Sequence, residues 1–225
     1  TRFFFWGDDP EEGRFALLDP YLSRFTARET DSAVPLQPRL DMPRQLEFPY
    51  AAGEDGDKGH VAVNWLTCET ADTGELLVLE MLEHILLGLP GSPLRKALIE
   101  SGLGEDLTGS GLVTDLRQTF FSVGLRSIAP GTAADVELLI METLADLAEG
   151  GVPAAAVEAA VNSVEFDLRE NNSGRFPRGL AAMIRSLATW LYDGDPIAPL
   201  AWEKPLADLK ARLASGEPVF EEAIK

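Results

Sequence analysis

Apolar and polar side chains alternate over residues 60–66, HVAVNWL. A period of two is typical of a strand that buries one face, so we expect Val61, Val63 and Trp65, or else the residues between them, to face a core. Other segments rich in β-branched or aromatic side chains and bounded by turn residues also predict strands. The predicted strands are the aromatic segment at 2–7, an edge strand near 44–49, the strand at 60–66 and two strands within 105–128.

Longer segments repeat apolar side chains every three or four residues, which predicts amphipathic helices. At the first of them, Pro10, Glu11 and Glu12 favour a helix start, since proline fits the first turn and carboxylates face the positive end of the helix dipole. Four prolines within residues 34–50 exclude a regular helix and predict an extended linker. The predicted helices cover about 10–26, 74–88, 92–101, 131–149, 153–171, 178–192 and 204–214.

The order of these elements indicates the fold class. A strand and a helix come first, and after the linker the order is β-β-α-α-β-β-α-α-α-α, with residues 51–59 as a turn or mobile loop. Strands in clusters followed by runs of helices favour an α+β domain rather than an alternating α/β one. We therefore predict a mainly antiparallel sheet packed against several helices.

The charge of the chain narrows the classes of partner. The 225 residues are 45% hydrophobic, as in ordinary globular proteins, and carry a net charge of −18. So acidic a surface repels phosphate backbones, and we expect no nucleic-acid partner. Basic peptides would be attracted if the acids line a cavity; an acidic surface that serves solubility alone is the alternative.

Cysteine content and apolar runs bear on the compartment. Cys68 is the single cysteine, so no intrachain disulfide can form, which suits the cytoplasm or the matrix of an organelle. No run of consecutive apolar residues reaches the roughly 18–20 that a bilayer-spanning helix needs, so we expect no membrane partner. The first residues, TRFFFWG, lack the architecture of a signal peptide, and the chain starts abruptly, as part of a longer protein would.

One pattern in the predicted helix 74–88 suggests metal chemistry. Glu80-x-x-Glu83-His84 differs by one residue from H-x-x-E-H, the inverted zinc-peptidase motif. Each helical residue advances about 100°, so these three side chains share one face. Glu80 and His84 would then bind one ion, with Glu83 positioned as a base.

The ligand types of this group argue against a zinc centre. Catalytic zinc sites usually contain two or more histidines, because neutral imidazole binds the ion without adding negative charge. A third ligand would have to come from elsewhere in the chain, and Glu158 or Glu165 on the predicted helix 153–171 are candidates. We expect no bound metal and no catalytic residue here, and we interpret this side of the helix as a surface that meets solvent or a neighbouring domain. The opposite side is a broad apolar stripe of Leu79, Met81, Leu82, Ile85 and Leu86.

Three other patterns give weaker signals. RENNSGRFPRG at 169–179 would either bind a carboxylate or phosphate, or pair its arginines with neighbouring acids. GSGL at 109–112 is too short for a phosphate-binding loop, because no Lys-Ser/Thr follows it. None of the serines considered, Ser110, Ser122 and Ser173, lies in a nucleophile elbow.

Four stretches together resemble the presequence protease branch of the pitrilysin-type inverted zinc metallopeptidases. The resemblance covers nearly the whole chain, and the longest stretch is the most specific. The stretches are FFFWGDDPEE (3–12), SPLRKALIESGLGEDLTGSG (92–111), TFFSVGLRSI (119–128) and LRENNSGRFPRGLAAMIRSLATWLYDGDPIAPL (168–200).

The resemblance implies a large peptidase whose homologous α+β domains close around unfolded peptides. In such enzymes the first domain carries H-x-x-E-H and zinc, and later domains share the fold without the metal. The chain then looks like the last strand and helix of the first domain (1–27), a linker (28–43) and most of a non-catalytic second domain (44–225) that lacks its final strand. It would need no cofactor of its own, although the parent enzyme would hold zinc. Its partners would be the other domains and unfolded peptides, basic ones included.

The resemblance also implies one binding role. In the related insulin-degrading enzyme, a glycine-rich segment after the corresponding helix anchors the N-terminal end of the substrate. The matching residues here are Gly88, Leu89, Pro90, Gly91 and Ser92, which would let an extended peptide approach the backbone. The alternative is that these residues only turn the chain between two helices. The competing functions are an inactive scaffold of peptidase fold and, least favoured, a metalloenzyme complete in itself.

Overall fold

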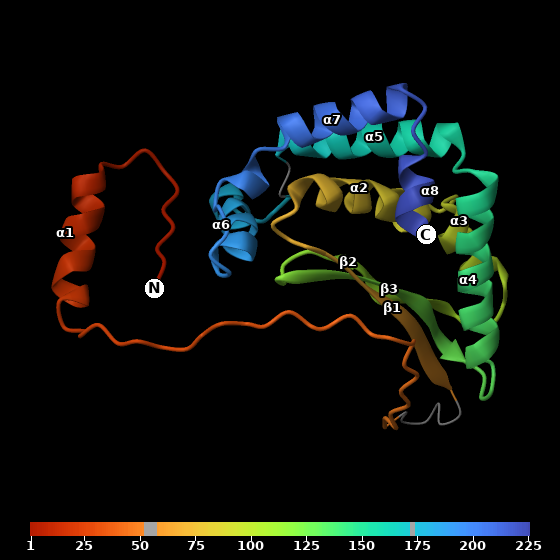
Figure 1. Ribbon diagram of the computed structural model, residues 1–225. Coiled ribbons are helices and arrows are strands. Elements are labelled where there is room, and N and C mark those ends of the chain that lie inside the picture. Colours follow the sequence, from red (N-terminus) through yellow and green to blue (C-terminus); the bar gives the residue numbers. More distant parts are fainter. Residues whose placement is uncertain (52–57, 172–173) are drawn as a thin grey trace.

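The computed structural model describes residues 1–51, 58–171 and 174–225 (Figure 1). It contains a three-stranded antiparallel sheet with the strand order β1-β3-β2 and helices packed against it. The predicted α+β class is therefore confirmed. Most of the loop predicted at 51–59 lies outside the described residues. The strands are β1 (Gly59–Glu69), β2 (Asp106–Val113) and β3 (Gln118–Ile128).

The alternation read in residues 60–66 sets the two faces of the sheet. Val61, Val63 and Trp65 of β1 pack against the core, whereas the residues between them are exposed. In the central strand β3, Phe121 lies opposite Trp65 on one side and opposite Leu112 of β2 on the other. The sheet thus presents one apolar face to the helices.

Helices cover that face in two layers (Figure 1). The inner layer contacts the strands and consists of α2 (Thr73–Glu83), α3 (Pro93–Glu100) and α4 (Ala133–Gly150). The outer helices α5 (Ala154–Glu170) and α7 (Glu203–Ala214) lie against α2 on the side away from the sheet. The remaining helical elements are α1 (Glu11–Leu22), the π-helical turn η2 (His84–Gly88), α6 (Arg178–Trp190), the 3-10 turn η3 (Ala198–Leu200) and α8 (Val219–Ile224).

The core is centred on α2 and the turn that follows it. Burial of each large apolar side chain contributes about 1.5–3 kcal/mol, so this helix is a main source of stability. By length and composition alone the stretch Thr73–Glu100 is apolar enough to cross a membrane, but it is broken by a turn at Leu89–Ser92. Its core side chains are Leu77, Val78, Met81, Leu82, Ile85, Leu86, Leu94 and Leu98.

Two of the predicted strands are wrong, and one helix was not predicted. Residues 2–7 and 44–49, all described, adopt no strand conformation. A strand needs a neighbour to bond its amides and carbonyls, and the first segment lies instead along α6. There Arg2 pairs with Asp193 at 2.5 Å and stacks over Trp190. The unpredicted helix is α8, whose Phe220 is 1% exposed.

Candidate functional site

The near-motif residues lie where α2 passes into η2, in the middle of the helical layers. Glu80, Glu83 and His84 are all partly buried. The expectation that they form a solvated face is therefore wrong, whereas a contact with a neighbouring domain stays a prediction. The reason is that α2 is enclosed on two sides, by the sheet and by α5 and α7, so its polar side chains also point into the protein.

Glu83 is held by the sheet. Its Oε1 accepts a hydrogen bond of 2.9 Å from the amide of Leu112, at the bulge of β2 between Thr108 and Gly111. Gly111 has a φ of 65°, and a Cβ atom there would overlap the same carboxylate oxygen. Burial raises the pKa of Glu83, and the Leu112 amide partly offsets this. The residue that would act as a base in H-x-x-E-H here joins a helix to a strand.

His84 packs against its own helical turn. A Cβ atom on Gly88 would lie 2.7 Å from Nδ1 of the imidazole, so the ring covers the glycine. Nε2 is buried and has no hydrogen-bond partner among the described residues. Within the same residues, no group of three or more histidine, cysteine, aspartate or glutamate side chains is placed to hold a metal ion.

The two candidate third ligands have other surroundings. Glu165 on α5 accepts hydrogen bonds from Lys210 and from Arg169, the latter at 2.7 Å. These bonds, first that from Lys210, lower the pKa of Glu165. Arg169 in turn stacks over the ring of Trp202, with its Cζ 5.9 Å from the ring centroid. Glu158 is exposed.

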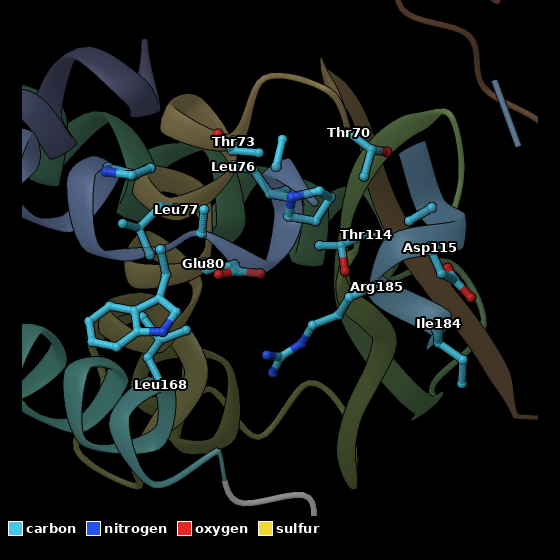
Figure 2. Close-up of a pocket in the computed structure, with 16 residues that line it drawn as sticks. Thr70, Thr73, Leu76, Leu77, Glu80, Thr114, Asp115, Leu168, Ile184 and Arg185 are labelled. Atoms are coloured by element: carbon cyan, nitrogen blue, oxygen red, sulfur yellow. The ribbon is translucent and has the colours of Figure 1, made fainter. Parts of the chain in front are cut away.

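Glu80 borders a cavity of about 150 Å³ between α2, α6 and the start of α7 (Figure 2). Its carboxylate has neither a hydrogen bond nor an ion pair with any described residue. Arg185 of α6 extends into the same cavity, as Figure 2 shows. Trp202 also lines it. Burial raises the pKa of Glu80, the positive charge of Arg185 lowers it, and Glu83 adds a smaller rise. None of the described residues that line the cavity is an activated nucleophile.

The glycine-rich segment forms a tight turn between η2 and α3. The amide of Ser92 donates to the carbonyl of Leu89 at 2.9 Å, and the amide of Leu89 donates to Ser92 Oγ at 3.0 Å. Ser92 is buried, and its hydroxyl also donates to the carbonyl of His84. Gly88, Leu89, Pro90 and Gly91 are exposed, and nothing lies within 4 Å of a Cβ atom built on Gly91. An extended peptide would meet the exposed side of this turn.

Reading the sequence missed the residues that give the site its form. Arg185 and Trp202 border the Glu80 cavity, but they come from separate segments more than 100 positions along the chain. The GSGL stretch was rejected as a phosphate-binding loop and was not interpreted further. A glycine inside a strand pattern is, however, a signal for a β-bulge. In the segment 169–179, Arg169 does pair with an acid, Glu165, whereas Asn172 and Ser173 lie outside the described residues.

The sequence matches the Peptidase M16 inactive domain over residues 1–164. It is 46% identical over 220 residues to presequence protease 1, chloroplastic/mitochondrial, of Arabidopsis thaliana, which covers 95% of this chain and 20% of that protein. The mitochondrial presequence protease of Mus musculus is 32% identical, over 100% of this chain and 22% of its own length. Protein HypA of Clostridium perfringens is also 32% identical, over 97% and 22%. The chain thus spans about a fifth of these relatives.

Solved structures share the fold. An insulinase family protease from Yersinia pestis aligns over 96% of this chain and 47% of its own, with a TM-score of 0.61 and 14% identity. The inactive peptidase domain of a zinc protease from Bordetella parapertussis aligns over 73% and 86%, with a TM-score of 0.56 and 18% identity. At such low identity the likeness concerns the fold alone.

Proposed function

The chain belongs to the family of inactive M16 peptidase domains, and from this premise we propose that it is a non-catalytic wall of the substrate chamber in a zinc-dependent peptide-degrading metalloendopeptidase. The observation that carries the proposal is the bond between Glu83 and the amide of Leu112. A glutamate that is partly buried and bonded to a strand is not available to activate water, so this helix would hold the position of the motif while its glutamate stabilises the fold.

The parent enzyme would supply the chemistry from elsewhere in its length. Zinc would activate a water molecule and a glutamate would act as general base, both in another domain. The partners of this chain would be those other domains and unfolded peptides, with no nucleic acid and no membrane involved. We place it in the cytoplasm or the matrix of an organelle; two of the relatives above are named as organellar proteins.

The turn Gly88–Ser92 is the part of the wall that would anchor a peptide backbone. Its exposed side is formed by Leu89, Pro90 and Gly91. Leu89 has an extended backbone, with φ −120° and ψ 156°, the conformation in which a residue pairs with an added strand. The open space beside Gly91 lets another backbone approach closely. Pro90 has no backbone N–H, and the N–H groups of Leu89 and Ser92 already donate within the turn. Pairing with a peptide would therefore rely on backbone carbonyl groups and on the N–H of Gly91.

A substitution at Gly91 separates binding from folding. We expect Gly91→Val to weaken the binding of a fluorescein-labelled unfolded basic peptide about tenfold in anisotropy titrations, since the side chain would block the approach. The unfolding midpoint should stay unchanged, because no atom lies within 4 Å of the added Cβ. Gly13→Val, at an equally open exposed glycine on α1, is the control and should leave binding intact. Failure of the unaltered chain to bind any unfolded peptide would refute the proposed function.

The exposed aromatic side chains of the first 50 residues favour a second candidate, an interaction scaffold of peptidase fold. Such side chains are the groups that a partner protein would cover, since burial of apolar surface drives protein association. A chain that binds no peptide but associates stably with a purified peptidase domain of a relative would support this alternative. The exposed aromatic residues are Phe3, Phe5, Trp6, Phe15, Tyr21, Phe25, Phe48 and Tyr50.

A further inference from the structure

We propose that the cavity beside Glu80 is a subsite for one cationic side chain, lysine or arginine, of a bound peptide. This proposal rests on the proposed function, because it names the side chain that such a peptide would insert. The subsite is distinct from the turn Gly88–Ser92, none of whose residues borders the cavity.

The size of the cavity suits a single side chain. Its volume is about 150 Å³, whereas pockets for drug-sized molecules measure about 300–1,000 Å³. Leu76, Leu77, Leu168 and Trp202 line it. Lysine and arginine lay an apolar stem along such surfaces and place the charge at the far end. A long side chain with a charged end thus matches both the volume and the walls.

One of the acids that line the cavity, Glu80, lacks a bonded partner in the described part of the chain. Glu83, the neighbouring acid, is already bonded to Leu112, but Glu80 has no bonded partner among the residues that the structure describes. The Glu80 oxygens still reach solvent, since the buried side-chain atoms without a partner among the described residues are His84 Nε2 and Ser186 Oγ. A ligand ammonium or guanidinium would give this carboxylate the charged partner that the described residues do not supply. Asp115, also on the wall, adds a second negative charge. The whole chain is acidic as well, with a net charge of −18.

Arg185 is the one charge on the wall that opposes a cation. Its side chain extends toward Glu80 in Figure 2, yet no ion pair joins the two side chains in the described structure. Two carboxylates and one guanidinium leave the lining with a net charge of −1. Arg185 is exposed on α6 and can turn toward solvent, whereas Glu80 is partly buried on α2, which packs against the sheet and the outer helices. The cavity therefore favours a cation over an anion.

The test uses the complete chain and two capped amino acids, N-acetyl-lysine methylamide and N-acetyl-norleucine methylamide, which lacks the ammonium. We expect the lysine probe, and not the norleucine probe, to shift the NMR signal of the Trp202 indole N–H, assigned through Trp202→Phe. Glu80→Gln should weaken the lysine probe about tenfold, as for loss of a charge-assisted hydrogen bond. Arg185→Met should tighten it. Glu137→Gln, at an exposed acid on α4, is the matched control and should change nothing.

The outcomes separate this proposal from the proposed function. An equal response to both probes, or an unchanged affinity in Glu80→Gln, would overturn the subsite. Arg185→Met provides the same test at an exposed position if Glu80→Gln fails to fold, since the subsite requires it to tighten binding. Binding of an unfolded peptide that is indifferent to Glu80→Gln would leave the proposed function standing. Glu80-dependent binding of the lysine probe without any binding of an unfolded peptide would overturn the proposed function and leave only the cation preference.

Discussion

The carboxylate of Glu83 accepts a hydrogen bond from the amide of Leu112 across the gap between α2 and β2, with 2.9 Å between the two atoms. The bond depends on Gly111, whose positive φ and missing side chain let the strand approach the helix. Two sequence features separated by almost thirty residues, the near-motif and the GSGL stretch, are thus parts of one contact.

Substitution of Gly111 should lower stability by more than the strain of a positive φ alone, because it also disrupts the contact with Glu83. Gly111→Ala places a Cβ atom on the Glu83 carboxylate and also strains a positive φ. Gly131→Ala is the matched control, because Gly131 has a φ of 86° and nothing within 4 Å. We expect Gly111→Ala to lower the free energy of unfolding in urea by at least about 1 kcal/mol more than Gly131→Ala does. Equal losses in the two variants would contradict the contact.

Removal of the Glu80 carboxylate should change how stability depends on pH. Burial raises the pKa of Glu80 above its usual value of 4.5, so the folded state binds this proton more tightly than the unfolded state. Stability contributed by the protonated acid is therefore present below pH 4.5 and is lost as the pH rises through the folded-state pKa. Glu80→Gln lacks this loss and should be more stable than the unaltered chain at neutral pH.

The measurement is urea unfolding of both proteins between about pH 4 and pH 8. The advantage of Glu80→Gln should shrink toward the acidic end. Groups whose pKa is lowered, such as Glu165 and Asp106, destabilise both proteins equally in acid and cancel in the difference. A difference that stays constant across this range would show that Glu80 titrates as an exposed acid does.

The isolated chain should neither retain zinc nor cleave peptides. Among the described residues, His84 packs on Gly88, Glu83 is bonded to Leu112, and no three potential ligands are placed to hold a metal ion. We expect elemental analysis after gel filtration to find far less than one zinc per chain, and a quenched fluorescent peptide to stay intact. One tightly bound zinc that is lost in Glu80→Ala or His84→Ala would contradict both expectations.

The aromatic segment 2–7 should detach from α6 when a side chain is added at Gly179, where Trp6 packs. A Cβ atom on Gly179 would lie 2.5 Å from Cγ of Trp6, so Gly179→Ala displaces the indole. Hydrogen exchange in residues 2–7 should become faster while exchange in the sheet stays the same. Gly150→Ala, at a helix end with nothing within 4 Å, should leave both unchanged. Unaltered exchange in Gly179→Ala would mean that the segment does not rely on this contact.

Local sequence patterns correctly predicted features that depend only on neighbouring residues, such as which face of a strand is buried. The inward row of Val61, Val63 and Trp65 follows from a period of two, because alternate side chains of a strand point to opposite faces whatever the rest of the chain does. The segment 2–7 has the composition of a strand but lies along α6, since composition does not supply a neighbouring strand. The six-residue helix α8 is too short to show a clear period.

The site was harder to predict because its parts are distant in sequence. Four of the five residues predicted for the apolar stripe of helix 74–88 lie in the core, Met81, Leu82, Ile85 and Leu86, whereas Leu79 does not. The polar side was assigned to solvent or to a neighbouring domain, because a sequence does not show that α5 and α7 cover it. Nothing near Glu80 in the sequence points to Arg185 or Trp202. Only the folded chain brings the three together.

The hydrogen bond between Glu83 and β2 also limits any attempt to restore catalysis in this domain by substitution. The single substitution Glu80→His would complete the sequence H-x-x-E-H. Glu83, the residue that would have to act as the base, would still be bonded to Leu112, and His84 would still pack on Gly88. Reviving hydrolysis would require remodelling a strand and a helical turn first. The contacts of Glu83 and His84, rather than the identity of residue 80 alone, therefore prevent a simple return to peptidase activity.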